Sequence, residues 1–415
     1  MYQAPRGTQD ILPGEQAYWR FIERKAIETY QLYGYERIDC PTFEDTGLFN
    51  RSVGEGTDIV EKEMYSFEDK GGNNITLRPE GTAPVCRAYL EHGLHTLPQP
   101  VKLYYFASIF RYERPQSGRF REHHQFGYEA IGDADPSLDA EVIDMAWRFF
   151  LSLGLRNLTV KVNSIGCKKC RPNYLTAVKD YYVKYADNLC SDCKARLKRN
   201  PLRLLDCKQP SCQPVAKAAP KSYDYLCPEC NEHFNGLKTN LGLLEIPFEV
   251  DHRLVRGLDY YTRTVFEVQP EQEGAQNTIG GGGRYDDLIE ELGGKPTPAI
   301  GFATGIERIV LNLKRQNVAI PPLPQPSVFI AHIGDEANKE AIKLASRLRQ
   351  AGIGVLTTLG DKSLKAQLRQ ANNLNVHYTI IIGEEELKSG SVILRDMATA
   401  QQKTVSNGEI EKELR

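Results

Sequence analysis

The chain has 415 residues, of which 41% are hydrophobic and 26% are charged, and its formal net charge is −2. This length suggests two or three domains with a sizeable core, and the ordinary composition argues against a disordered or fibrous chain. There is no run of 18 apolar residues and no apolar stretch of signal-peptide length at the start, so we expect a cytoplasmic protein without a membrane span.

The first 165 residues mix helical and extended patterns without regular alternation. Apolar spacing predicts a helix over 15–32, an extended segment over 35–49 broken at Pro41, and strands over 63–67, 74–78 and 101–111. A helix over 82–92 is expected to be capped by Thr82, and a helix over 139–153 precedes a strand over 158–163. Because strand–helix–strand repeats are few, an antiparallel α+β sheet is favoured over a doubly wound one.

Residues 166–243 have helical spacing and most of the cysteines, which predicts an inserted, mainly helical module. Strand patterns return over 248–252, 264–269 and 299–302, so the first domain is expected to be discontinuous, comprising 1–165 and 244–320.

Eight of the ten cysteines fall between Cys167 and Cys230. Without a secretion signal, metal ligation or free thiols are favoured over disulfides. Two Cys-x-x-Cys pairs can supply the four thiolates of a structural zinc site, and the candidates are Cys190, Cys193, Cys227 and Cys230. Cys167 and Cys170 form a third pair, and Cys207 and Cys212 lie between the pairs that begin at Cys190 and Cys227. The long gap between the pairs leaves reduced, packed thiols as the alternative.

The proline-rich segment 321–326 is incompatible with a helix and predicts a stiff linker. Beyond it, strands over 327–333, 354–358, 378–383 and 391–396 and helices over 337–351 and 363–373 predict a small α/β domain spanning 327–415. The basic runs 194–203 and 362–369 are either local patches for a polyanion or solvated helix faces.

Three arginine-bearing segments suggest an anion pocket. An alternating strand sends Arg111 and Glu113 to one face, where a guanidinium can hold a phosphate bidentately, although cross-strand pairing with acids is the alternative. Arg256 precedes two adjacent tyrosines and a later run of glycines. Arg308 lies in the opening turn of a helix that follows Gly301, where a cation requires an anionic ligand or an acid to offset the helix dipole.

These segments resemble the motifs of class II aminoacyl-tRNA synthetases: the Pro41 region resembles motif one, the Arg111 hairpin motif two and the Arg308 segment motif three. The stretch from Arg256 to Thr262 resembles the signature of the histidyl-tRNA synthetase family. The resemblance also covers residues 6–12, 76–82 and the C-terminal domain. It implies a discontinuous class II catalytic domain, a C-terminal anticodon-binding domain and a homodimer whose interface includes the Pro41 region.

The resemblance further implies ATP-dependent ligation of L-histidine to tRNA(His) through a histidyl-adenylate, with release of pyrophosphate and AMP. Arg111 and Arg256 would be catalytic, and Mg²⁺ would accompany the pyrophosphate. The nucleotide would contact Arg111, Glu113, Arg119 and Arg308. Histidine would contact Glu80, Gly81, Thr82, Arg111, Gln125, Glu129, Arg256, Tyr260 and Tyr261, although tyrosines at this spacing are more often core residues. The loop 116–121 would meet the acceptor end of the tRNA.

Two other functions compete with this interpretation. One is a catalytically inactive, histidine-sensing regulatory paralogue of an ATP phosphoribosyltransferase, which would be expected to lose the Arg256 segment or the terminal domain. The other is an RNA-binding scaffold with a vestigial nucleotide site, against which the three arginines argue. The terminal domain could also serve only as a dimer prop.

Overall fold

The computed structural model describes residues 2–54, 57, 59–113, 120–270, 278–358, 360 and 362–414. The chain divides into two compact units, Met1–Pro321 and Pro322–Arg415, so the division falls within the proline-rich segment. Among the described helices, none has the length and apolar character needed to cross a bilayer.

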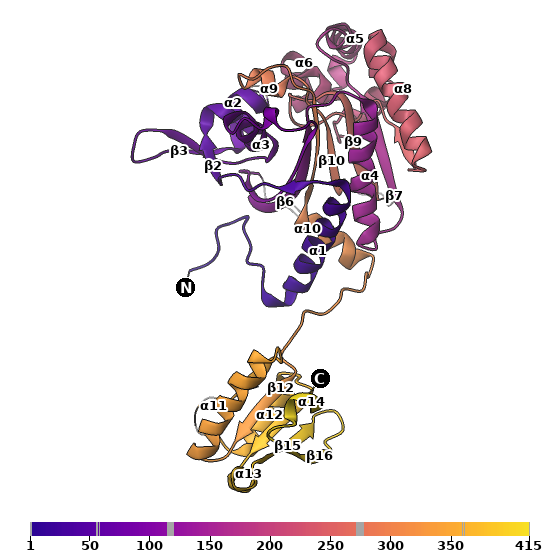
Figure 1. The fold of residues 1–415 in the computed structure, drawn as a ribbon. Helices are drawn as coiled ribbons and strands as arrows, with labels where there is room; N and C mark the ends of the chain where they lie inside the picture. The colour runs from indigo at the N-terminus through magenta and orange to yellow at the C-terminus, as the bar shows by residue number, and fades with distance from the viewer. Residues whose placement is uncertain are drawn as a thin grey trace. The chain divides into compact units, whose positions relative to one another are not determined.

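An eight-stranded sheet forms the centre of the first unit (Figure 1). Its six inner strands pair antiparallel, whereas the two short edge strands pair parallel with their neighbours, which confirms the predicted α+β class. The strand order is β1 (Glu36–Arg37), β5 (Val101–Phe110), β6 (Glu122–Ile131), β11 (Ala299–Gly305), β10 (Gly280–Arg284), β9 (Thr262–Pro270), β7 (Leu158–Ser164) and β8 (Phe248–Val250).

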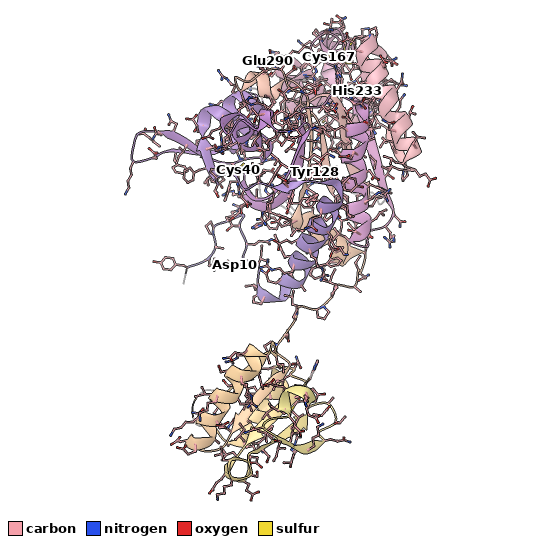
Figure 2. The ribbon with its side chains drawn as sticks, in the orientation of Figure 1. Asp10, Cys40, Tyr128, Cys167, His233 and Glu290 are labelled. Carbon is pink, nitrogen blue, oxygen red and sulfur yellow. The ribbon has the colours of Figure 1, made fainter. Side chains whose placement is uncertain are left out.

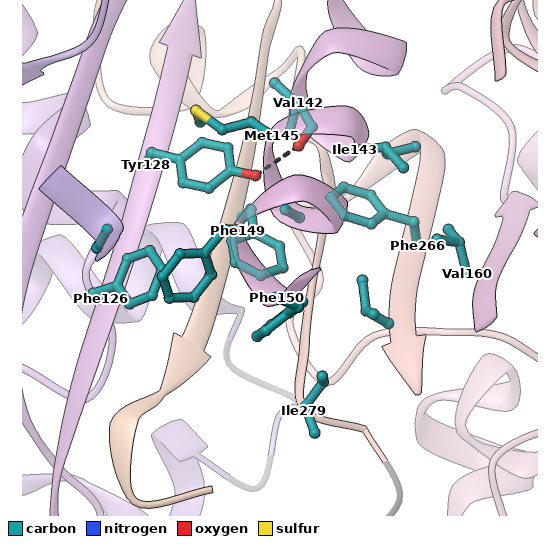
Figure 3. Close-up of a cluster of buried hydrophobic side chains, with 14 of the residues drawn as sticks. Phe126, Tyr128, Val142, Ile143, Met145, Phe149, Phe150, Val160, Phe266 and Ile279 are labelled. Carbon is teal, nitrogen blue, oxygen red and sulfur yellow. Dashed lines mark hydrogen bonds between the residues drawn. The ribbon is translucent and has the colours of Figure 1, made fainter. Parts of the chain in front are cut away.

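One face of this sheet is covered by helices and is apolar. Phe126 and Tyr128 on β6 pack there with Phe149 of α4 (Pro136–Ser152) and Phe266 of β9, and the Tyr128 hydroxyl donates to the Val142 carbonyl oxygen at 2.6 Å (Figure 3). Since side chains alternate along a strand, Gln125, Gly127 and Glu129 must lie on the opposite face. The alternation therefore separates the core face from a polar face.

The helices on the apolar face are α1 (Gln16–Tyr33), α4, α8 (Pro228–Leu243) and α10 (Ile306–Arg315). Helix α4 begins where the Asp135 carboxylate accepts from the Ser137 N–H at 2.8 Å, with Pro136 in its first turn. Helix α1 ends at Gly34, whose φ of 73° suits a residue without Cβ. These local signals explain why α4 begins, and α1 ends, close to the predicted residues.

A three-stranded antiparallel sheet, β2 (Phe43–Asp45), β4 (Asn74–Leu77) and β3 (Tyr65–Glu68), adjoins α2 (Thr46–Val53) and α3 (Thr82–Glu91). The prediction of extended chain through residue 49 is wrong. The Asp45 carboxylate accepts from the Gly47 N–H at 2.7 Å and caps α2, a helix start that the extended pattern concealed. A π-helical turn, Ile59–Glu63, precedes β3.

The cysteine-bearing insertion is helical. It contains α5 (Arg171–Val183), α6 (Ser191–Arg199), α7 (Gln213–Lys217) and α8, with 3₁₀ turns at Ala186–Asn188, Pro201–Leu204 and Ser222–Tyr225. Tyr182 and Leu204, from the part of the insertion before α8, belong to the same hydrophobic cluster as Tyr105 of β5, whereas Phe234 and Leu237 of α8 belong to the cluster on the helix-covered face. The insertion therefore packs against both faces of the sheet, and the part before α8 covers some of the face that also carries the polar residues. Short helical segments elsewhere in this unit are Pro13–Glu15, Leu94–Thr96 and α9 (Leu288–Glu291).

The second unit is a five-stranded sheet with its own core around Val328, Ile380 and Leu394. The strand order is β13 (Val355–Thr357), β12 (Val328–His332), β14 (Tyr378–Ile382), β15 (Ser391–Asp396) and β16 (Gln402–Ser406), in which β12 pairs parallel with β13 and β14 and the remaining pairs are antiparallel. Its helices are α11 (Asp335–Gln350), α12 (Leu364–Asn373), α13 (Glu384–Ser389) and α14 (Ile410–Glu413). β16, α13 and α14 were not predicted.

Candidate active site

A cavity of about 450 Å³ opens on the polar face of the large sheet. Arg111, Arg256 and Arg308 all line it, although they lie far apart along the chain. Its other walls come from β6, β9, β10, β11 and the start of α10. The three guanidinium groups therefore converge on one space, as the sequence predicted.

Each arginine is oriented by an acceptor of its own. The Arg111 Nε donates to the Pro79 carbonyl oxygen at 2.7 Å, and the Arg308 Nη1 donates to the Thr278 carbonyl oxygen at 2.9 Å. The Arg256 Nη1 lies 2.6 Å from Oε1 of Glu267, and its guanidinium carbon is 6.0 Å from the centre of the Tyr261 ring. A carbonyl oxygen carries no net charge, so these two hydrogen bonds orient the guanidinium groups of Arg111 and Arg308 without neutralising them.

Glu267 was not predicted, and it holds the Arg256 side chain. Burial by itself would raise the pKa of Glu267, but the Arg256 charge and hydrogen bonds from Thr278 and Gln269 bring that pKa below its ordinary value. Burial would also lower the pKa of Arg256, yet the Glu267 carboxylate raises it above the ordinary value. Both groups are therefore charged at neutral pH.

The glycine run Gly280–Gly283 forms most of the central strand β10, a strand that was not predicted. A Cβ on Gly281 would lie 2.8 Å from Nη1 of Arg256. A Cβ on Gly301 of β11 would lie 1.7 Å from Oε2 of Glu129. The absent side chains make room for the charged groups of the site.

Behind the cavity, Glu129 lies at the centre of a buried hydrogen-bonded cluster. Its Oε1 accepts from the Thr82 hydroxyl at 2.8 Å and the Tyr105 hydroxyl at 3.3 Å, and its Oε2 accepts from the Tyr285 hydroxyl at 2.6 Å. Burial raises the pKa of Glu129 to about 8, against these hydrogen bonds and with a further contribution from Glu80. At neutral pH this carboxyl is mostly protonated, and a cation beside it would favour ionisation.

Glu80 takes the capping role that was predicted for Thr82. Its two carboxylate oxygens accept from the backbone N–H groups of Ala83 at 2.7 Å and Thr82 at 2.8 Å, which opens α3. The prediction that Thr82 caps this helix is wrong, because its hydroxyl donates to Glu129 instead. The Tyr260 hydroxyl donates to Glu80 at 3.3 Å, and burial raises the pKa of Glu80.

The predicted histidine contacts thus occupy two adjoining places. Gln125 and the two arginines line the cavity, and Oε1 of Gln125 is buried with no hydrogen-bond partner among the described residues. The remaining side chains form the buried cluster behind it, with the Tyr260 and Tyr261 rings 4.8 Å apart. Gly81 lies within this cluster, where a Cβ would be 2.4 Å from the Tyr105 ring.

Of the predicted nucleotide contacts, Glu113 lines the cavity together with Arg111 and Arg308. Arg119 lies outside the described residues, as does most of the 116–121 loop. The Arg111 N–H donates to the Arg121 carbonyl oxygen at 2.9 Å, so the hairpin continues beyond the ends of β5 and β6.

Several other cavity residues were not predicted, among them His123, Asp206 and Lys208. His123 lies near Arg111 and Arg308, and burial together with these two charges lowers its pKa to about 3, so its imidazole is neutral. Asp206 and Lys208 reach the cavity from the insertion. His123 lies on β6 of the Arg111 hairpin and could have been found by its position there, whereas nothing in the linear pattern places residues 206–208 at the cavity.

The cysteines do not form the predicted zinc site. Cys190 and Cys193 lie with Cys207 and Cys212, whereas Cys227 and Cys230 lie with Cys167 and Cys170. The combination of the 190–193 and 227–230 pairs is therefore wrong. Spacing along the chain could not reveal which pairs the helices of the insertion bring together.

Comparison with known proteins identifies the family. Residues 7–169 and 217–309 match the model of the histidyl-tRNA synthetase family, and residues 327–415 match an anticodon-binding domain. A histidine–tRNA ligase of Dehalococcoides mccartyi is 64% identical over 98% of this chain and 97% of its own length, and one from Desulforamulus reducens is 51% identical over 98% and 97%.

The fold also matches a solved structure. Apo histidyl-tRNA synthetase from S. aureus superposes with a TM-score of 0.83 at 38% identity, covering all of both chains. High identity to ligases over nearly the whole length does not favour the regulatory alternative. The chain therefore belongs to the histidyl-tRNA synthetase family.

Proposed function

We propose that the protein joins L-histidine to tRNA(His) in two steps, first forming histidyl-adenylate from histidine and ATP with release of pyrophosphate, then transferring the histidyl group and releasing AMP. The observation that carries this proposal is the convergence of Arg111, Arg256 and Arg308 on one cavity. Three fixed cations suit a triphosphate, whose transfer chemistry depends on positioning and charge stabilisation.

In the first step, the histidine carboxylate attacks the α-phosphorus of ATP in line, and pyrophosphate leaves. Arg111 and Arg256 flank the α-phosphate and stabilise the charge that develops on its oxygens, while Arg308 binds the γ-phosphate. Glu113 and Arg119 hold the nucleotide. Mg²⁺ would accompany the nucleotide and would supply positive charge that offsets the charge of the departing pyrophosphate.

Histidine lies between the cavity and the buried cluster. Its ammonium group is held by the floor that Glu80, Thr82, Gln125 and Glu129 provide, and its imidazole lies against Tyr260 and Tyr261. A buried carboxyl whose pKa is about 8 is suited to this role, because the arriving ammonium draws it to the charged form. Hydroxyl and amide partners reject isosteric side chains that cannot complete their hydrogen bonds.

The tRNA engages both units of the chain. The second unit reads the anticodon, which its match to an anticodon-binding domain supports, since unpaired bases expose their sequence to a protein. The 116–121 loop meets the acceptor end. Charging of tRNA for protein synthesis places this activity in the cytoplasm.

The protein acts as a homodimer whose interface includes the Pro41 region. Phe43 on β2 and Phe67 on β3 are 54% and 49% exposed, although both are large apolar side chains on one small sheet. Exposed apolar groups that cluster in this way are typical of a subunit interface.

The test is histidine-dependent exchange of labelled pyrophosphate into ATP, measured without tRNA across all twenty amino acids. Exchange with histidine alone is expected. Folded protein that binds histidine but shows no exchange would contradict the proposal in favour of the regulatory function.

A further inference from the structure

Eight of the ten cysteines form two separate quartets within or beside the insertion. The neck quartet comprises Cys167, Cys170, Cys227 and Cys230, and the distal quartet comprises Cys190, Cys193, Cys207 and Cys212. In each quartet all four sulfur atoms lie within 4.8 Å of one another, and all ten cysteines of the chain are free thiols. We propose that each quartet binds one zinc ion, so that the protein carries two structural Zn(Cys)₄ sites per chain.

The sulfur separations match a tetrahedral zinc site. Zinc–sulfur bonds of about 2.3 Å at tetrahedral angles put neighbouring sulfur atoms about 3.8 Å apart. Cys167 Sγ lies 3.8 Å from Cys170 Sγ and 3.9 Å from Cys227 Sγ, and Cys190 Sγ lies 3.9 Å from Cys207 Sγ. An iron–sulfur cluster does not fit, because cysteines bound to different iron atoms would be farther apart than these quartets allow.

Backbone groups around the quartets favour bound thiolates. The Cys167 N–H donates to Cys170 Sγ at 3.3 Å, and the Cys190 N–H donates to Cys212 Sγ at 3.4 Å. Such hydrogen bonds stabilise negative sulfur and fix the ligand orientation around a metal. Cys167 and Cys227 of the neck quartet and Cys190 of the distal quartet are half-buried, and the other five cysteines are buried, so the sulfur atoms are shielded but still accessible to an entering metal ion.

The neck quartet joins the two ends of the insertion. Cys167 and Cys170 lie between β7 and α5, whereas Cys227 and Cys230 open α8, and Cys167 is seen at this end of the first unit (Figure 2). Arg171 follows Cys170 directly, and its guanidinium donates to the carbonyl oxygens of Gly166 and Tyr261. A zinc ion here would therefore hold α5 and α8 together next to the backbone of Tyr261, which is one of the predicted contacts of the substrate histidine.

The distal quartet lies inside the insertion and next to the cavity. Cys207 is flanked by Asp206 and Lys208, both of which line the cavity with the three arginines. The segment from Leu205 to Cys212 contains no helix or strand that would fix it. Zinc bound to Cys207 and Cys212 would hold this segment against the cavity wall and supply folding free energy that its few apolar residues cannot. The match to the family model does not include residues 170–216, the stretch that contains this quartet.

The first test is elemental analysis of the full-length protein, purified without a metal-affinity step or chelator and under reducing conditions. Two zinc ions per chain are expected. Cys227→Ser and Cys207→Ser should each retain about one zinc per chain, and the double variant should retain none, because three thiolates bind zinc far more weakly than four. Cys40→Ser, a half-buried cysteine outside both quartets, is the matched control and should retain two.

A second measurement uses the wild-type protein, so it does not depend on whether the cysteine variants fold. Wild-type protein is titrated with a mercurial thiol reagent while a colorimetric indicator reports released zinc, and eight thiols should react as two zinc ions appear. Exchange with Co²⁺ should add thiolate-to-cobalt charge-transfer and tetrahedral ligand-field bands for two equivalents. Protein with no bound metal, with one zinc per chain, or with iron in place of zinc would overturn the proposal. These readouts do not depend on the ligase activity, so they are independent of the proposed function.

Discussion

Replacing Arg256 by alanine removes one of the cations proposed to stabilise the α-phosphate. A unit charge about 4 Å from a phosphate oxygen is worth up to about 4 kcal/mol at an effective dielectric constant of 20. Loss of one oriented donor in comparable sites costs about 10²- to 10³-fold in rate, or about 3–4 kcal/mol. We expect histidine-dependent pyrophosphate exchange to fall by this factor, chiefly in kcat, because the charge develops in the transition state.

Arg253→Ala is the matched control. Arg253 lies three residues earlier, pairs with Asp251 at 3.1 Å and does not line the cavity, so exchange should remain close to the wild-type rate. If folded Arg256→Ala protein exchanged pyrophosphate at the wild-type rate, the role given to this guanidinium would be refuted.

The Arg256→Ala substitution should also change how the free energy of unfolding depends on pH. In the wild-type protein the pKa of Glu267 is lowered, despite its burial, by Arg256 and two hydrogen bonds. A carboxylate with a depressed pKa stabilises the fold above its unfolded pKa, and this contribution is lost as the pH falls through the folded pKa. Without Arg256, burial raises the pKa of Glu267. The loss in free energy of unfolding should therefore be larger at pH 7 than at pH 4, as measured by urea denaturation; an equal loss at both pH values would refute the electrostatic coupling.

Three further outcomes are expected. Histidine binding at pH 7 should release up to one proton, since the ammonium group favours the ionised form of Glu129, whose pKa is about 8 without ligand. Calorimetry in buffers of different ionisation enthalpy should detect this release in the wild-type protein and not in Glu129→Gln. Equal proton release in both proteins would contradict the role given to Glu129. Phe43→Asp should weaken dimer association by about 1.5–3 kcal/mol per protomer, because apolar area at the interface is lost. Val183→Asp, at an exposed apolar position on α5, should leave dimer association unchanged. Sedimentation that shows an unchanged dimer in Phe43→Asp would rule out this surface as the interface. Residues 327–415 have their own core, so removing them should leave pyrophosphate exchange intact. The rate of tRNA charging should fall by about tenfold or more, equivalent to about 1.4 kcal/mol of lost binding free energy. Undiminished charging would contradict the proposal that this unit reads the anticodon.

The sequence by itself determined the elements with strong local periodicity and the arginines of the site. The alternation expected of a strand through residue 111 predicted that Arg111 and Glu113 share one face, and both line the cavity although β5 ends at Phe110. Amphipathic spacing located α4, and the proline that precedes the helix helped to locate α3, each to within a few residues, although the predicted cap of α3 was wrong. The resemblance of the Arg111, Arg256 and Arg308 segments to family motifs then indicated a shared cavity.

Tertiary structure alone decided the features that depend on which segments meet. Glycines have low strand propensity, so β10 exists only because β9 and β11 pair with both of its edges. Likewise, Glu267 acquires its role from the approach of Arg256, and Lys208 reaches the cavity through the path of the insertion. The cysteine quartets depend on how helices return across sixty residues between Cys167 and Cys227. Such long-range contacts follow from the packing of the whole core, and local sequence preferences do not contain them.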